Sequence, residues 1–208
     1  IKKIIFASSS SVAGSNNNMY FDETQNTDSP ISLYAATKKN NEILAHFYAV
    51  NYKIRIIGVR FFTVFGPFGR PDLSIFKFAY FIKNSKNFFL NNNGNHFRDF
   101  TYIDDAIECL NRLIMLKKFH NRDSKINKYF QIFNLGGGNK IKITFIVKIL
   151  EKLIGRKAKI KFGPLKKGDI VFSRSSTKKL YRNIKYYPKT SIKNGLKKFY
   201  NWFETNDF

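Results

Sequence analysis

Apolar residues along this chain follow two spacings, one typical of buried strands and one typical of amphipathic helices. Short apolar and β-branched runs predict strands at residues 3–7, 54–60, 88–90, 98–103 and 130–135. Apolar residues that recur every three to four positions predict helices at residues 33–52, 74–83 and 104–116. After residue 138 the pattern predicts a helix, a strand and two more helices, with Trp202 in the last. Because strands and helices alternate, we expect an α/β protein with a largely parallel sheet.

The composition is that of a globular protein with an unusual charge. Of the 208 residues, 43% are hydrophobic and 25% are charged, and the formal net charge is +23. Such a charge could indicate a nucleic-acid partner. However, the basic residues are scattered in short pairs, and the chain is rich in Lys, Asn, Ile and Phe together, which is typical of an AT-rich genome. We therefore expect no nucleic-acid partner and keep that function as the minor alternative.

Cysteine and histidine usage excludes several kinds of site. Cys109 is the single cysteine, so an internal disulfide cannot form, which fits a reducing compartment such as the cytoplasm. His46, His96 and His120 show no spacing typical of metal ligands, so we expect no metal site. No apolar run reaches about 18 residues, so we expect no membrane span.

Two segments near the start of the chain could carry chemistry. Residues 8–11 are four serines directly after a predicted strand, where α/β proteins bind ligands; a solvated serine loop is the alternative. Tyr34 and Lys38 are four residues apart and fall on one helix face. A nearby ammonium favours the phenolate form of tyrosine, so Tyr34 could act as an acid or base. Taken alone, this pair is weak evidence, because tyrosine and lysine are both abundant here.

Two later segments add polar groups at predicted loop and strand positions. In the run GVRFFTVFGPFGRPD, Thr63 offers a hydroxyl and Arg70 a bidentate anion donor. In the run RDFTYIDD, Arg98 could bind a phosphate. The three aspartates of that run could form an acidic site, although Asp104 and Asp105 fit the start of a helix better.

In this order, the motifs resemble the extended short-chain dehydrogenase/reductase family. The motifs are SSSSVAG, SLYAATKKNNE, GVRFFTVFGPFGRPD and RDFTYIDD. Within that family they are most similar to UDP-glucuronate 4-epimerases and their relatives in bacterial capsule polysaccharide biosynthesis. The resemblance implies the C-terminal part of a Rossmann-like, doubly wound parallel sheet with a smaller substrate-binding lobe. It assigns residues 1–66 to the NAD-binding domain with the catalytic helix, 67–97 to the lobe, 98–135 to the sheet again and 136–208 mainly to the lobe.

The resemblance also implies roles for individual residues. Tyr34 would be the catalytic base, Lys38 would hold the nicotinamide ribose of NAD, and Ser9 would hydrogen-bond the reacting hydroxyl. The cofactor side would further include Ala7, Ser8 and Phe61. The UDP-sugar would be held by Ser10, Ser11, Thr63, Arg70, Arg98 and Asp169, with Arg98 at the diphosphate and Asp169 at the uridine.

The implied reaction inverts C4 of UDP-glucuronate to give UDP-galacturonate. Tyr34 would take the C4 hydroxyl proton while NAD oxidises the sugar transiently to a 4-keto form. Another NAD-dependent nucleotide-sugar epimerase or a decarboxylase is the nearest alternative. Dehydration is disfavoured, because the serine segment has no acidic pair. The helix that carries Tyr34 would also form a homodimer interface, by resemblance alone.

The chain departs from the family pattern at three places. Ala13 stands where the family has tyrosine, which would leave a void or a wider site. Phe65 and Phe68 replace tyrosine and tryptophan, which are mild changes. The GxxGxxG phosphate loop does not occur, and the run 136–138 lies too late to replace it. An inactive, truncated fragment is therefore a further alternative.

We expect this 208-residue chain to bind NAD weakly or to fold poorly by itself. The missing βαβαβ half would be roughly a hundred residues, and without it the sheet would expose an apolar edge and face. Titration of the chain with NAD by calorimetry checks the first expectation. Tight binding at one NAD per chain would contradict it.

Overall fold

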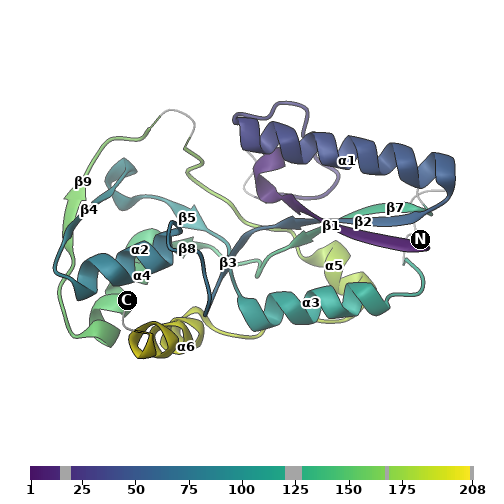
Figure 1. Ribbon diagram of the computed structural model, residues 1–208. Coiled ribbons are helices and arrows are strands. Elements are labelled where there is room, and N and C mark those ends of the chain that lie inside the picture. The colour runs from purple at the N-terminus through teal and green to yellow at the C-terminus, as the bar shows by residue number, and fades with distance from the viewer. Residues whose placement is uncertain (15–19, 120–127, 167–168, 207–208) are drawn as a thin grey trace.

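The computed structural model describes residues 1–14, 20–119, 128–166 and 169–206, so His120 lies outside the described residues. Two halves lie next to each other in Figure 1, one built on a parallel sheet and one a smaller lobe of helices and short strands. The N-terminus lies in the sheet half and the C-terminus in the lobe. In the described part of the chain, no helix has the length and apolar character to cross a membrane.

The sheet half has three parallel strands in the order β1 (Lys3–Ser9), β2 (Arg55–Phe61) and β7 (Phe130–Leu135). Each lies within two residues of the strand predicted from the apolar pattern. β2 is buried along most of its length and β7 along all of it, whereas most of β1 is half-buried. The edge strand β1 leads into the serine segment, and the central strand β2 leads towards Thr63.

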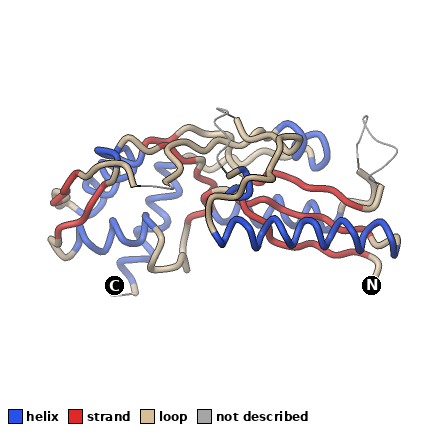
Figure 2. Tube along the Cα trace, turned by 90° about the horizontal axis from the view of Figure 1, so that it is seen from above, coloured by secondary structure: helices blue, strands red, loops and turns tan. Residues whose placement is uncertain are grey.

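Helices cover both faces of this sheet, as the predicted doubly wound fold requires. The long helix α1 (Leu33–Tyr52) covers one face, and Figure 2 shows it running along the strands for most of their length. Helices α3 (Ile103–Met115) and α5 (Lys178–Ile184) cover the other face. Neighbouring strand residues face opposite sides, so Ile56 packs beneath α1 whereas Ile57 packs against α3 and α5.

The smaller lobe is built from the remaining helices and from short strands that associate in pairs. Its elements are β3 (Thr63–Phe65), α2 (Ser74–Lys83), β4 (Asn87–Leu90), β5 (Phe97–Arg98), β6 (Phe100–Tyr102), β8 (Ile141–Lys142), α4 (Ile143–Ile154), β9 (Lys159–Phe162) and α6 (Ile192–Thr205). The pairs β3–β6 and β4–β9 are parallel, and the pair β5–β8 is antiparallel. Aromatic side chains from α2 and α6, such as Phe76 and Phe203, form the centre of the lobe's core.

Two details of the chain path differ from the sequence prediction. The predicted strand 98–103 is wrong as a single element, because β5 ends at Arg98, β6 begins at Phe100 and α3 already begins at Ile103. The intervening Asp99 turns its carboxylate to other parts of the chain. Helix α5, from the segment assigned mainly to the lobe, packs on β7 in the sheet half, so that segment contributes to both halves.

A buried ion pair fixes α1 on the sheet. Arg60 of β2 donates two hydrogen bonds to Glu42 of α1, both at 2.8 Å, and Ser8 of β1 donates a third to the same carboxylate at 2.6 Å. All three side chains are buried. An unpaired charge would be costly at this depth, so the contact strongly favours one register of α1 against β1 and β2.

We expect Glu42→Gln to lower the free energy of unfolding by about 3–5 kcal/mol, because it leaves the Arg60 charge buried without its partner. Urea unfolding of the two proteins measures this difference. Glu108→Gln is the matched control, since Glu108 forms an exposed pair with Arg112 four residues away, where we expect a loss of at most about 0.5 kcal/mol. Equal losses in the two variants would contradict the role given to the buried pair.

Candidate functional site

Tyr34 and Lys38 lie at the start of α1, beside the end of β1. The Ser32 hydroxyl begins the helix by accepting a hydrogen bond from the Ala35 amide at 3.1 Å. One turn further on, the Lys38 ammonium lies 5.7 Å from the Tyr34 ring centroid and donates to the Ala7 carbonyl at 3.0 Å. The predicted spacing of four residues therefore brings the lysine against the tyrosine, and the tyrosine ring itself remains exposed.

The serine segment turns sharply after β1 and packs against α1. Ser9 caps a short 3-10 helix, η1 (Ser10–Ala13), by accepting from the Ser11 amide, and it donates to the Ser11 hydroxyl at 3.1 Å. The Ser8 side chain points away, towards Glu42. The segment is thus an ordered turn at the carboxyl end of a parallel strand, in which Ser9 is buried and Ser10 and Ser11 are half-buried.

Thr63 and Arg70 line one small, mostly apolar cavity of the smaller lobe, between β3, β6, α2 and α6. Arg70 is exposed and donates to both carboxylate oxygens of Asp72, at 2.9 and 2.5 Å. The Asp72 carboxylate raises the pKa of Arg70, and Tyr34 adds a smaller contribution in the same direction. The Arg70 guanidinium therefore lies within electrostatic range of Tyr34.

Arg98 and Asp169 are neighbours, although 71 positions separate them in the chain. Burial lowers the pKa of Arg98, and the Asp169 carboxylate opposes that shift. Asn91 donates to Asp169 at 3.2 Å, and the Nε2 atom of His96 lies 3.9 Å from the same carboxylate. This group of four residues is called the Arg98 cluster below.

Asn91 and His96 were not among the residues predicted to bind a ligand. The sequence offered one signal, because His96 comes two positions before Arg98 and strand alternation can place such residues on the same side. The structure adds that both residues contact Asp169, which belongs to a distant loop.

Asp99 is a structural residue, so the hypothesis of an acidic site at this position is wrong. Its side chain has no exposed surface, and its carboxylate accepts hydrogen bonds from the amides of Gly137, Gly138 and Asn139 at 2.9–3.2 Å. Both the amide and the hydroxyl of Ser175 also donate to it. The amides of the glycine run thus donate to a carboxylate of the protein itself. A Cβ at Gly136 would collide with Ser175 and Asp99.

Asp104 and Asp105 begin helix α3, as the sequence predicts. Asp105 is buried and accepts from the Tyr186 hydroxyl at 2.6 Å and from the Thr190 amide at 2.8 Å. These contacts attach the segment before α6 to the sheet half. Neither aspartate lies in the cluster around Arg98.

The departures at Ala13 and Phe68 have visible consequences. A small cavity lies beside Ala13 and is also lined by Ser10 and Phe62. Phe68 is exposed, with its ring 5.3 Å from that of Trp202.

Cys109 is fully buried, and burial raises the pKa of its thiol to about 12, which excludes a reactive thiolate.

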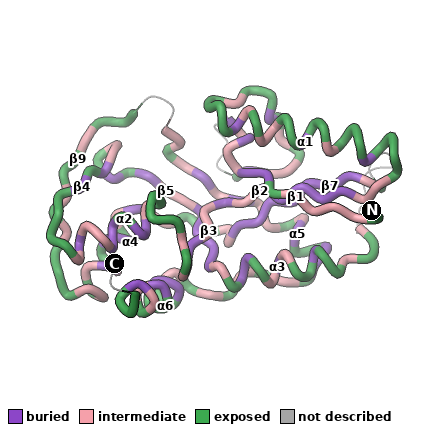
Figure 3. The backbone as a smooth tube through the Cα atoms, in the orientation of Figure 1, coloured by how far each residue is buried: buried purple, intermediate pink, exposed green. Residues whose placement is uncertain are grey.

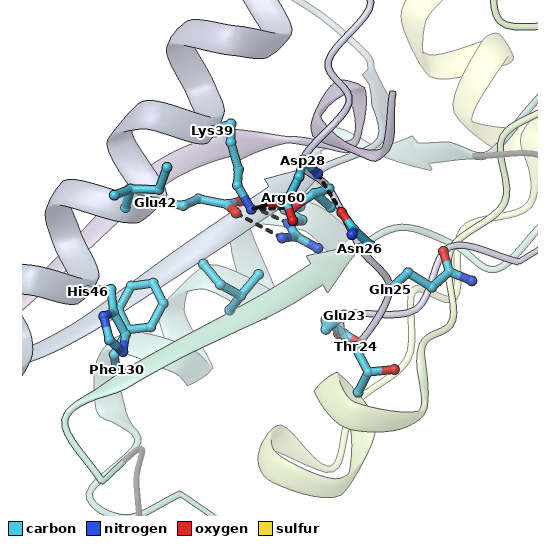
Figure 4. A pocket seen from close by; sticks show the side chains of 13 residues that line it. Glu23, Thr24, Gln25, Asn26, Asp28, Lys39, Glu42, His46, Arg60 and Phe130 are labelled. Atoms are coloured by element: carbon cyan, nitrogen blue, oxygen red, sulfur yellow. Dashed lines mark hydrogen bonds and ion pairs between the residues drawn. The ribbon is translucent and has the colours of Figure 1, made fainter. Parts of the chain in front are cut away.

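A wider cavity of about 530 Å³ lies on the far side of the buried ion pair. Figure 4 shows it between residues 23–28, helix α1 and strand β7. Its cations are already paired, Arg60 with Glu42 and Lys39 with Asp28 at 3.0 Å. The residues that line it include none of those predicted to bind substrate or cofactor.

Comparison with known proteins gives one family and many relatives. A model of the NAD dependent epimerase/dehydratase family matches residues 1–136. UDP-glucuronate 4-epimerase 5 of Arabidopsis thaliana is 42% identical over an alignment of 207 residues, which covers 96% of this chain and 48% of the plant protein. Protein CapI of Staphylococcus aureus is 37% identical over an alignment of 211 residues, which covers 98% of this chain and 63% of CapI.

Solved structures agree with these relatives. The UDP-glucuronic acid 4-epimerase from Bacillus cereus, in complex with UDP-glucuronic acid and NAD, superposes with a TM-score of 0.85 at 29% identity. The match covers 98% of this chain and 62% of the Bacillus cereus chain. The chain thus spans about three-fifths of the length of bacterial relatives and about half that of the plant protein.

We expect Asp99→Asn to destabilise the protein by on the order of 3 kcal/mol, because an amide cannot accept from all the donors that now converge on the carboxylate. Hydrogen exchange should then become faster at the Gly137 and Gly138 amides. Asp104→Asn, at an exposed carboxylate on the same segment, is the control and should leave both quantities unchanged. Unchanged exchange at the glycines in the Asp99 variant would show that the carboxylate does not hold this loop.

Proposed function

The chain belongs to the NAD-dependent epimerase/dehydratase family, and on this premise we propose that it carries the acid–base and substrate-binding side of a UDP-glucuronate 4-epimerase. The product would be UDP-galacturonate. The observation that carries the proposal is the position of the Lys38 ammonium, between the Tyr34 ring and the carbonyl at the end of β1. Relatives named UDP-glucuronate 4-epimerase support the choice of substrate.

Tyr34 is the proposed acid and base. Its exposed ring can reach a bound sugar and would take the C4 hydroxyl proton, with the Lys38 ammonium 5.7 Å from the ring centroid. Ser9, at the turn after β1, would hydrogen-bond the same hydroxyl and orient it. Tyr34 would then return a proton to the C4 oxygen to complete the inversion.

NAD would supply the hydride acceptor and donor for C4. The residues at the carboxyl ends of β1 and β2 fit its nicotinamide side, because this edge of a parallel sheet is where such ligands bind. Lys38 uses one of three ammonium donors on the Ala7 carbonyl, so two remain for ribose hydroxyls. Phe61 lies beside Ser9 in the register of the two strands, whereas Ser8 can offer only its main chain, since Glu42 holds its hydroxyl.

The proposed substrate site extends from the serine turn to the Arg98 cluster. Ser10 and Ser11 would contact the sugar and its carboxylate, together with Thr63. Arg70 would contribute its guanidinium after leaving Asp72, a contact that is weak because both side chains are exposed. Arg98 would bind the diphosphate as an anion, and Asp169 would accept hydrogen bonds from the uridine.

The outer face of α1 supports the proposal of a homodimer. Figure 3 shows this face as exposed along most of the helix. The large apolar side chains on α1 that are 48–82% exposed include Leu33, Ile43, Leu44, Phe47 and Tyr48. An apolar stripe of this length is typical of a helix that packs against a partner, and a second copy would bring two such stripes together.

Tyr34→Phe should lower the turnover of UDP-glucuronate by about a thousandfold, since it removes the proton-transfer group, and should leave the affinity for the nucleotide sugar unchanged. The measurement uses the intact protein from its source cells, with product analysis for turnover and calorimetry for affinity. Tyr52→Phe, at an exposed tyrosine on the same helix, is the matched control.

Arg98→Ala should give the opposite pattern, a loss of affinity of about tenfold or more. Full turnover in the Tyr34 variant would contradict the role of Tyr34 as acid and base. Full affinity in the Arg98 variant would contradict the binding of the diphosphate by Arg98.

A further inference from the structure

His96 is buried in the Arg98 cluster, with one ring nitrogen that has no partner among the described residues. The residue is 8% exposed, and in this part of the chain its Nε2 atom is enclosed without a hydrogen bond. A buried polar atom without a partner costs free energy, so such an atom in a binding site indicates a contact that forms only in another state. The Asp169 carboxylate is close enough to become that partner, at 3.9 Å.

The surroundings of the ring determine what Nε2 can do. The main chain of Asn91 raises the pKa of the imidazole, as a carbonyl near a ring N–H does. Because Nε2 has no hydrogen bond, we infer that this carbonyl faces Nδ1. In the neutral ring Nδ1 then holds the only proton, and Nε2 is an acceptor facing a carboxylate. Only the protonated ring can donate from both nitrogens and pair with Asp169.

Burial and three neighbouring groups determine the charge of the ring. Burial and the Arg98 cation lower the pKa of His96, whereas Asp169 and the Asn91 main chain oppose this shift. At the start of α4, the Ile143 amide donates to the main-chain carbonyl of His96 at 2.9 Å, and this contact adds no charged group next to the ring. The ring is therefore neutral near pH 7, with the Arg98 cation beside it.

We propose that His96 is a positioning residue of the nucleotide site, which takes up a proton when a diphosphate binds at Arg98 and then holds the Asp169 carboxylate through Nε2. This inference rests on the proposed function of the Arg98 cluster. Burial is the larger cause of the neutral ring, and an anion at Arg98 cancels the repulsion that adds to it. The new ion pair gives Nε2 its missing partner. The bound proton comes from solvent, so nucleotide binding and proton uptake are linked.

The sign of this linkage follows from the direction in which binding moves the pKa of His96. Binding raises that pKa above its value in the free protein, so affinity increases as the pH falls through the bound-state pKa and is constant well above it. A pKa that is higher by one in the complex strengthens binding by at most tenfold, so we expect affinity to increase by about threefold to tenfold between about pH 8 and pH 6.

Calorimetry with UDP-glucose tests this, because its diphosphate does not ionise in that pH range. Titrations in buffers of different ionisation enthalpy give the number of protons taken up on binding. We expect a fraction of one proton for the unmodified protein near about pH 6.5, which is the ordinary pKa of histidine. We expect none for His96→Gln, whose amide can donate to Asp169 without protonation.

Two further variants complete the test. His96→Gln should show at about pH 8 the affinity that the unmodified protein reaches near about pH 6, because its amide donates to Asp169 at either pH. His96→Leu should bind like the unmodified protein at about pH 8 and should gain no affinity as the pH falls, because leucine cannot hold the Asp169 carboxylate. His46→Gln, at a histidine on α1 outside the cluster, should behave as the unmodified protein.

The outcomes separate this inference from the function on which it rests. Binding of UDP-glucose without proton uptake, or with the same uptake in His96→Gln, would overturn the role of His96 and leave the nucleotide site standing. If the unmodified protein does not bind UDP-glucose, or if Arg98→Ala binds it with unchanged affinity, the proposed nucleotide site is wrong. The role of His96 is then wrong as well. The unmodified protein alone decides the first case, so the result does not depend on whether a variant folds.

Discussion

The position of helix α1 on the sheet depends on one buried carboxylate, that of Glu42. Arg60 and Ser8 converge on it from neighbouring strands, so the helix cannot slide or rotate without leaving an unpaired charge in the core. Glu42, Lys38 and Tyr34 follow one another at intervals of four residues and share a helix face. Once Glu42 is fixed, Lys38 reaches the end of β1 and Tyr34 projects beyond it, next to the serine turn.

A second buried carboxylate performs the corresponding task for the other half of the site. Asp99 gathers the amides of the glycine run and of Ser175, so it joins the end of β7 to the segment that leads into α5. Arg98 directly precedes Asp99, so the fixed position of Asp99 also fixes the main chain from which the Arg98 side chain extends. The two ends of the proposed substrate site are therefore set by two carboxylates that take no part in the chemistry.

Much of this arrangement could be predicted from the sequence. The apolar spacing is regular and predicts helix 33–52 with its observed ends. The closeness of Tyr34 and Lys38 follows from helical geometry. The pairing of Glu42 with Arg60 could not be predicted, because it joins two elements 18 residues apart whose relative position only the fold decides. The break between β5 and β6 at Asp99 could not be predicted for the same reason, because the donors to the Asp99 carboxylate come from residues 137–139 and 175. The individual roles came from family resemblance, which local patterns could not have supplied.

The central claim is that this chain provides the acid–base side of C4 inversion on UDP-glucuronate. Proton NMR of UDP-glucuronate incubated with the intact protein from its source cells tests it most directly, because the coupling constants of the sugar protons report the configuration at C4. The account predicts a mixture in which UDP-galacturonate appears and the carboxyl carbon is retained. Loss of that carbon would instead identify a decarboxylase, and unchanged UDP-glucuronate in the presence of added NAD would contradict the claim.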